Sequence, residues 1–430
     1  TIATEMICLA NSLQDLFFSR MEKTFPALKV RNFRYFWVGQ LISVMGTWMQ
    51  TAAQSWLVLT ITDSPFLLGL LGVAQFTPVL ILSLPAGVFV DRFPKRSIVI
   101  LTQIASMILA FILAILVFTN TVQYWHIFLL AFGLGLVKTL DIPARQSFMI
   151  ELVGRDVVLN AVALNSTVIN LGRIVGPALA GVVMALVGAG WCFLVNGVTF
   201  IAVIVGLFKI DVAPVVRKRP KGTVIPDIKE GLIYLFKSPI LTTTTLILAI
   251  VSTFGMNYSV LIPVFARNQL GLDAQGYGLL MSSLGVGSLL GALIVAGGSS
   301  RGPKRVRLFV VPFITSSLFI IMGFNSSYLL SALLIGSMGF ANIFFTTTAN
   351  SLMQIHSDNE YRGRVMSVYS LVFAGSTPLG NMFVGSIADR AGAGSAFFWA
   401  GVVTVLLVLG TTMAHKVRKR ISATKSDAEA

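Results

Sequence analysis

The chain has 430 residues, of which 55% are hydrophobic and only 11% are charged, against roughly a quarter charged in a soluble domain. A water-soluble fold of this length has too little interior to bury so much apolar surface, so that class is excluded. A net charge of +15 could indicate a nucleic-acid partner if the basic residues clustered on one surface. Most of them lie instead in the loops between apolar segments, as described below.

Apolar stretches long enough to cross a bilayer recur along almost the whole chain. A spanning helix needs about 20 mostly apolar residues, and in hydrocarbon only helices or closed barrels satisfy every backbone polar group. The stretches are continuous rather than alternating, which excludes a barrel. We therefore predict an all-α integral membrane protein with twelve transmembrane helices, at residues 35–60, 67–90, 97–118, 124–145, 158–187, 191–208, 241–265, 276–298, 307–324, 327–349, 365–387 and 394–414.

Lysine and arginine gather in alternate loops. Of the 32 basic residues, 28 fall on one side of the predicted membrane, Lys138 and Arg173 lie inside spans, and only Arg267 and Arg390 lie opposite. Basic loops stay in the cytoplasm. We expect a multi-pass protein of the bacterial inner membrane with both termini cytoplasmic, in contact with membrane lipid and with no nucleic-acid partner.

The longest polar interruption, 209–240, is rich in proline and basic residues and separates six spans from six. Apolar residues at helical spacing near its end predict a short amphipathic helix on the membrane surface. Residues 1–20 lack the order of a signal peptide, and we expect them to form an extension with no role in the fold. The predicted organisation is an N-terminal cytoplasmic extension (1–30), a first six-helix bundle (31–208), a cytoplasmic linker (209–240), a second six-helix bundle (241–414) and a basic cytoplasmic tail (415–430).

The two halves repeat each other weakly. Parallel repeats of six spans are one architecture of secondary transporters, with the substrate site at mid-membrane between the halves. A shift of 204 residues aligns Ser147 with Ser351, Met149 with Met353, Ser166 with Ser370, Gly176 with Gly380 and Gly181 with Gly385.

Polar side chains on the first span and on the seventh, its equivalent in the second half, are candidates for the substrate cavity. Gln50 and Gln54 are four residues apart and share a helix face, and Asn257 and Tyr258 lie on the seventh span. Apolar pockets with a few polar groups suit organic ligands. The alternative is that these residues only pack.

The turn between the second and third spans combines a glycine with charges at short spacing. Gly87 allows close helix approach, and Asp91 ends the second span beside Arg92, Lys95 and Arg96. An acid in this position can face the positive N-terminal end of another helix. Cytoplasmic basic residues with an N-capping acid are the simpler interpretation of the same charges.

Three charged residues share one face of the fourth span. Lys138, Asp141 and Arg145 stand at i, i+3 and i+7, so Asp141 can pair with both cations. Charges inside a membrane are costly and suggest function. Asp141 is the one carboxylate placed clearly within a span, which makes it the candidate proton carrier. A structural ion-pair network is the alternative.

The fifth span carries Gly172, Gly176, Pro177 and Gly181, a spacing that lets helices pack backbone to backbone. Arg173 lies inside this motif. It is a candidate to offer its donors to an anionic or carbonyl-rich substrate, or to pair across the bundle with Asp141.

Several of these stretches resemble a known family. The segment 87–96 (GVFVDRFPKR) is similar to the signature loop of the major facilitator superfamily. Segments 31–40 (RNFRYFWVGQ), 141–147 (DIPARQS) and 172–177 (GRIVGP) resemble a bacterial branch that includes the enterobactin exporter and drug-efflux relatives.

The resemblance covers residues 25–415 and implies roles for two motifs. It implies that Asp91 acts as a conformational latch on the start of the eleventh span, at 361–364, where Arg364 lies. It associates the Gly-Pro motif with antiporters, although Ala180 stands where that pattern commonly has a glycine.

Enzyme chemistry finds little support. The three histidines and two cysteines are scattered, so no metal site is expected, and no phosphate-binding GxxxxGK[ST] motif is present. We predict a protein that is not an enzyme and has no cofactor.

The predicted function is secondary active export of a small organic molecule, drug-like and amphipathic or siderophore-like. A monomer would work by alternating access between the halves, exchanging substrate for protons. The alternatives are proton-coupled uptake on the same scaffold, and a non-transporting membrane protein or lipid flippase.

Overall fold

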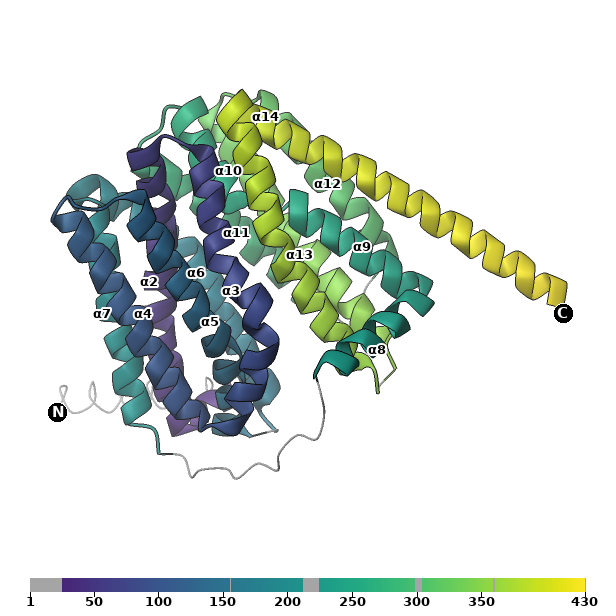
Figure 1. Cartoon of the computed structure of the whole chain (residues 1–430), viewed down its shortest axis with the longest axis horizontal. Helices are drawn as coiled ribbons and strands as arrows, with labels where there is room; N and C mark the ends of the chain where they lie inside the picture. The colour runs from purple at the N-terminus through teal and green to yellow at the C-terminus, as the bar shows by residue number, and fades with distance from the viewer. Residues whose placement is uncertain (1–24, 155, 212–223, 298–303, 359, 430) are drawn as a thin grey trace, which may run out of the picture.

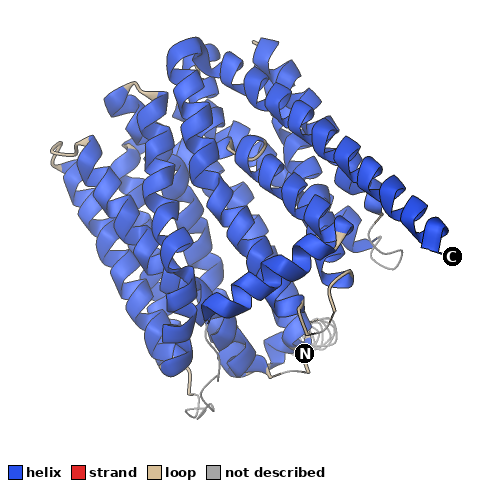
Figure 2. Ribbon diagram, turned by 45° about the vertical axis from the view of Figure 1, so that its right-hand side comes forward, coloured by secondary structure: helices blue, strands red, loops and turns tan. Residues whose placement is uncertain are grey.

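The computed structural model describes residues 25–154, 156–211, 224–297, 304–358 and 360–429, without the side chains at 84, 88, 91, 224–229, 231 and 416–429. Every regular element in this part of the chain is a helix (Figure 2). In chain order these are η1 (Pro26–Lys29), α2 (Arg31–Thr62), α3 (Pro65–Arg92), α4 (Lys95–Phe118), α5 (Tyr124–Val153), α6 (Val158–Val187), α7 (Ala189–Phe208), α8 (Val224–Lys237), α9 (Pro239–Phe254), α10 (Tyr258–Val264), η2 (Phe265–Gln269), α11 (Ala274–Gly297), α12 (Arg305–Phe324), α13 (Tyr328–Ile355) and α14 (Arg362–Glu429).

The helices account for twelve membrane crossings. Ten helical stretches of the described chain are long and apolar enough to span a bilayer, and one of them, Arg362–His415, contains two segments because the backbone leaves helical geometry at Gly392. The remaining crossing is α2, whose 32 residues reach about 48 Å. Its buried glutamines make it more polar than the others. The predicted all-α fold with twelve transmembrane helices is confirmed.

Two bundles lie side by side, α2–α7 and α9–α14 (Figure 1). Large apolar side chains remain exposed on their outer faces, including Leu101 at 65%, Leu186 at 78% and Phe324 at 78%. Exposed apolar surface on this scale marks contact with a membrane. The short helix α8 occupies the second part of segment 209–240 and packs against α9 and α14.

Local signals set where the helices begin and end. Ser64 caps α3, accepting a hydrogen bond from the Leu67 amide, and Pro65 takes the first helical position, where no amide hydrogen is needed. Gly188 ends α6 at φ 93°, and Gly392 breaks α14 at φ 85°. Both values lie in the region that favours glycine. These two glycines are separated by the same 204 residues that relate the two halves.

The bundles touch at one end of the molecule. There α6 packs against α11, and α3 packs against the first segment of α14. We call this the closed end; it carries the α2–α3 turn and the turn at Gly392. The opposite end carries segment 209–240, and we call it the linker end. Figure 1 shows the two bundles approaching each other near α10 and diverging toward α8.

Glycines related by the 204-residue shift make equivalent contacts. A Cβ on Gly176 would lie 3.0 Å from the Met45 carbonyl oxygen of α2, and the nearest atom to one on Gly380 would be the Thr253 carbonyl oxygen of α9, each within its own half. The other related pair joins the two halves. A Cβ on Gly181 would lie 3.0 Å from the Ala274 carbonyl oxygen, and one on Gly385 would lie 2.9 Å from the Pro65 carbonyl oxygen. The weak sequence repeat therefore corresponds to repeated helix packing.

Candidate functional site in the cavity between the halves

A cavity of about 470 Å³ opens between the two halves on the linker side. It is bounded by the second part of α3, the second part of α5 and the first part of α14. Its wall is mainly apolar with a few hydroxyl and amide groups, which is the composition of a site for an organic ligand. The lining residues are Val79, Leu80, Ser83, Lys138, Thr139, Ile142, Pro143, Gln146, Gly363, Met366, Ser367, Val368, Ser370, Leu371 and Ala374.

Asp141 lies beside this cavity in a saturated hydrogen-bond network. One carboxylate oxygen accepts from the Thr102 hydroxyl at 2.7 Å and from the Gln103 amide at 3.0 Å. The other accepts from the Arg145 guanidinium at 2.6 and 3.0 Å. All four lone-pair directions are therefore used. The network joins α5 to α4 within one half.

The other two intramembrane cations are placed differently. Lys138 reaches the cavity wall. The guanidinium of Arg173 lies 5.3 Å from the ring centre of Trp48 on α2, a cation–π contact. In this conformation no ion pair between described residues joins Arg173 to Asp141.

The Gly-Pro motif of α6 has two packing faces. Gly172 and Gly176 face α2, where added Cβ atoms would lie 2.7 Å from Val44 and 2.5 Å from Trp48. The Pro177 carbonyl and Gly181 face α11 of the other half. There a Cβ on Gly278 would lie 2.5 Å from the Pro177 oxygen. The motif thus joins α6 both to its own half and to the opposite half.

The remaining candidate cavity residues are buried and lie outside the cavity wall. Gln50 and Gln54 are buried on α2, and Gln50 accepts a hydrogen bond from the Asn196 amide of α7 at 2.6 Å. On α10 and its N-cap, the Tyr258 hydroxyl and the Asn257 side-chain oxygen are buried, with no hydrogen-bond partner among the described residues. Such atoms are rare in folded proteins and point to a missing partner. None of the four residues lines the cavity in this conformation.

The charged turn between α3 and α4 stabilises helix ends on the linker side. The buried Lys95 ammonium donates to the Val90 and Phe93 carbonyls, and the Arg96 guanidinium donates to the Leu207 and Phe208 carbonyls. Cations in these positions satisfy carbonyls that a helix C-terminus leaves unpaired.

The other members of the predicted latch have different surroundings or lie outside the description. Arg364 forms an ion pair of 2.7 Å with Glu230 on α8, and Arg92 is exposed. A Cβ on Gly87 would meet no atom of the described residues within 4 Å, so Gly87 makes no close helix contact with them in this conformation. The side chain of Asp91 lies outside the described residues.

Polar contacts that sequence reasoning missed join the halves at the closed end. Arg267, in η2, donates to the Leu59 carbonyl and lies 3.2 Å from the Asp63 carboxylate. Asp389 accepts from the Ser64 hydroxyl at 2.7 Å and from the Phe66 amide at 3.3 Å. One available signal was that Arg267 is one of only two basic residues on the sparsely charged side of the membrane.

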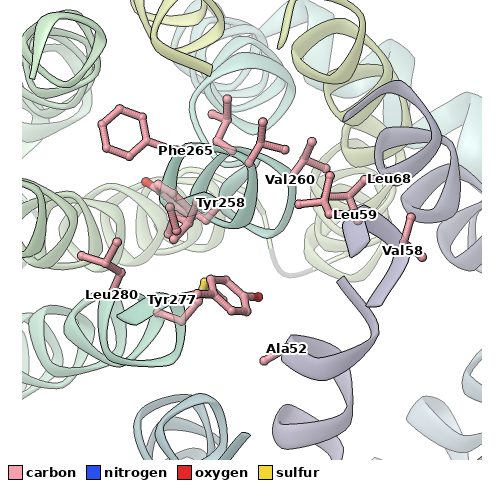
Figure 3. Packing of buried hydrophobic residues seen from close by; sticks show 14 of the residues in the cluster. Ala52, Val58, Leu59, Leu68, Tyr258, Val260, Phe265, Tyr277 and Leu280 are labelled. Carbon is pink, nitrogen blue, oxygen red and sulfur yellow. The ribbon is translucent and has the colours of Figure 1, made fainter. Parts of the chain in front are cut away.

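Apolar packing supports the same closure. Figure 3 shows side chains of α2, including Ala52 and Leu59, near Tyr258 of α10 and Tyr277 of α11. The rings of Trp56 and Tyr277 stack across the halves at 5.3 Å between centres. The structure is therefore closed at one end and carries a cavity at the other.

The sequence pattern of a transporter family extends over nearly the whole chain. The model of the transmembrane secretion effector family matches residues 22–430. The chain belongs to this family of major facilitator transporters. Membership identifies it as a membrane transporter rather than an enzyme, and it confirms the resemblance drawn from the sequence motifs.

Several major facilitator transporters are similar to this chain over nearly their full length. The staphyloferrin A transporter of Staphylococcus aureus is 25% identical over 87% of this chain and 94% of that protein. The multidrug efflux pump Tap of Mycolicibacterium fortuitum is 25% identical over 88% and 95%. The enterobactin exporter EntS of Citrobacter koseri is 23% identical over 90% and 92%.

Solved structures share the fold of this secretion effector family member. The nucleoside transporter NupG matches with a TM-score of 0.73, covering 89% of this chain and 98% of that chain at 12% identity. A bacterial homolog of the lysosomal transporter Spinster, in an inward-facing and occupied conformation, matches with a TM-score of 0.68, covering 90% and 96% at 15% identity. These likenesses concern the fold.

Proposed function

We propose that this transporter exports a small organic molecule, drug-like and amphipathic or siderophore-like, in exchange for protons. The observation that carries the proposal is the asymmetry between the two ends. The halves are joined at the closed end by α3–α14 and α6–α11 packing, while a cavity of about 470 Å³ lies between them on the linker side. This is one of the two states that alternating access requires.

The basic loops relate this state to the membrane. The linker end carries most of the lysine and arginine residues of the loops, and such loops stay in the cytoplasm. In the proposed orientation, a monomer in the bacterial inner membrane has both termini inside, and its cavity faces the cytoplasm. An exporter loads its substrate from this side.

Two features support export in particular. Relatives of this chain include a protein named as a multidrug efflux pump and another named as an enterobactin exporter. The Gly-Pro motif, which resembles that of antiporters, lies at the α6–α11 contact that must open when the cavity changes sides. Substrate release then requires separation of the halves at the closed end.

Asp141 is the proposed proton carrier, because it is the carboxylate on α5 that lies beside the cavity. In the present state its oxygens are occupied by Thr102, Gln103 and Arg145. Proton uptake requires that this network loosens when the halves rearrange. We propose that the cavity then reaches the buried polar atoms of Asn257 and Tyr258, which lack partners among the described residues.

Transport into inverted membrane vesicles tests the proposal. Vesicles carrying the protein should accumulate substrates from a panel of siderophores and amphipathic drugs when the interior is acidic, and a protonophore should abolish this accumulation. Vesicles without the protein are the control. Accumulation only in right-side-out vesicles would indicate uptake, and accumulation that resists the protonophore would refute proton exchange.

A further inference from the structure

Lys138 is the only charged residue among the fifteen described residues that line the cavity. It projects from α5 on the side that faces α3 and the first part of α14, and its side chain is partly exposed to the cavity. The wall contributed by the described residues contains no carboxylate.

No contact within the part of the chain that the structure describes neutralises the ammonium group of Lys138. Among the described residues it forms neither a hydrogen bond nor an ion pair. Asp141 lies one helical turn away and interacts with it electrostatically, but both Asp141 oxygens are already occupied by donors from Thr102, Gln103 and Arg145. This neighbouring acid is therefore committed to another cation.

Arg173 adds a second intramembrane cation in the same half. It contacts the face of Trp48 and is within electrostatic range of Tyr258 in the other half, with no carboxylate partner among the described residues. An uncompensated charge inside a membrane protein is costly, and it persists where it faces a cavity or a ligand. The half that bears both cations thus presents excess positive charge toward the space between the halves.

We propose that the transported molecule is an organic anion and that Lys138 binds its acidic group in the cavity; this rests on the proposed export function. Apolar residues such as Ile142, Met366 and Leu371 would contact the organic body. Hydroxyl groups such as those of Ser83 and Thr139 can donate further hydrogen bonds to the acid. An organic cation meets repulsion from Lys138 and finds no acid in the described wall.

The test uses three ligands that share one aromatic body and differ in charge: 2-naphthoate, 2-naphthamide and protonated 2-naphthylmethylamine. Their affinities for the purified full-length transporter are measured by isothermal titration calorimetry. The variants are Lys138→Met, which removes the charge, and Lys138→Arg, which keeps it. Lys209→Met is the matched control, because Lys209 is exposed at the end of α7 and away from the cavity.

The wild type should bind naphthoate about tenfold more tightly than naphthamide, the scale of one charge-assisted contact in a partly hydrated site. Lys138→Met should abolish this preference and leave the affinity for naphthamide within about twofold of the wild-type value. Lys138→Arg and Lys209→Met should preserve the preference. A naphthoate preference that survives Lys138→Met, or a wild type that binds the three ligands equally or not at all, overturns the assignment.

Transport of the same ligands into inverted vesicles separates this inference from the proposed function. Accumulation of the amide or the ammonium without preference for naphthoate would support export and refute anion selectivity. Binding of naphthoate through Lys138 without accumulation of any ligand would support the binding site and contradict export.

Discussion

The carboxylate of Asp389 lies 2.7 Å from the hydroxyl oxygen of Ser64, although the two residues are 325 positions apart in the chain. Ser64 is the N-cap of α3, and Asp389 lies near the end of the first segment of α14. The acid also accepts the Phe66 amide, so it faces the positive N-terminal end of α3. This contact joins the two halves at the closed end.

A glycine, an acid and an arginine recur at one spacing at opposite ends of the α3–α14 pair. Gly385, Asp389 and Arg390 in α14 repeat the spacing of Gly87, Asp91 and Arg92 in α3. Asp389 contacts the start of α3 in the present state. We propose that Asp91 contacts the start of α14 when the linker end is closed. The two acids would then stabilise opposite states of one transport cycle.

Asp389→Asn is expected to favour opening of the closed end. A charge at a helix N-terminus contributes about 1 kcal/mol at an exposed position, which corresponds to about a fivefold change in the ratio of states. Spin labels at Thr121 and Ser326, exposed positions in the closed-end loops of the two halves, should report a larger population at long distance. Asp273→Asn is the control, because Asp273 caps α11 inside its own half. An unchanged distance distribution would argue against Asp389 as an element of closure.

Asp91→Asn is expected to favour the present state, in which the linker end is open. The variant should insert normally and lose nearly all turnover, because the state that is closed at the linker end loses its latch. Labels at Asp156 and Gln354, exposed on the linker side, should report more of the open distance. Asp211→Asn offers a matched control with an exposed acid on the same side. Normal turnover by well-expressed Asp91→Asn protein would refute the latch proposal.

Asp141→Asn is expected to separate coupling from substrate movement. Without a group that titrates, gradient-driven export should stop, whereas counterflow of substrate without a proton gradient should persist. Both activities are measured in the same vesicles after size-exclusion chromatography shows intact protein. Loss of both would assign Asp141 a structural or substrate-binding role through its network with Arg145. Survival of both would place the proton carrier elsewhere.

Gly278→Ala is expected to disfavour the present state. The added methyl group would lie 2.5 Å from the Pro177 carbonyl oxygen across the halves, and overpacking of this kind costs about 1–3 kcal/mol. The labels at Thr121 and Ser326 should again move to longer distance. Gly133→Ala makes the same change where the nearest atoms, at 3.5 Å, belong to the flexible Leu109 side chain. Equal behaviour of the two variants would exclude tight α6–α11 packing as the reason for closure.

The amino-acid sequence alone determined the membrane crossings and their division into two sets of six. Each spanning helix must satisfy its own backbone hydrogen bonds, so length and apolar content identify it without knowledge of its neighbours. The 204-residue repeat was also visible, and the contacts of Gly176 and Gly380 show why it persists: both glycines allow close packing of equivalent helices. Family membership was evident from motifs such as the segment 87–96.

Only the tertiary structure decided which charges face one another and which end is closed. The donors to Asp141 from Thr102 and Gln103 belong to a neighbouring helix, and helix spacing within α5 predicts only the contact with Arg145. The contact between Asp389 and Ser64 depends on how two distant helices pack. A transporter also has at least two packings of similar free energy, and local patterns are the same in both. The choice of state therefore lies in contacts between the halves, which no local pattern contains.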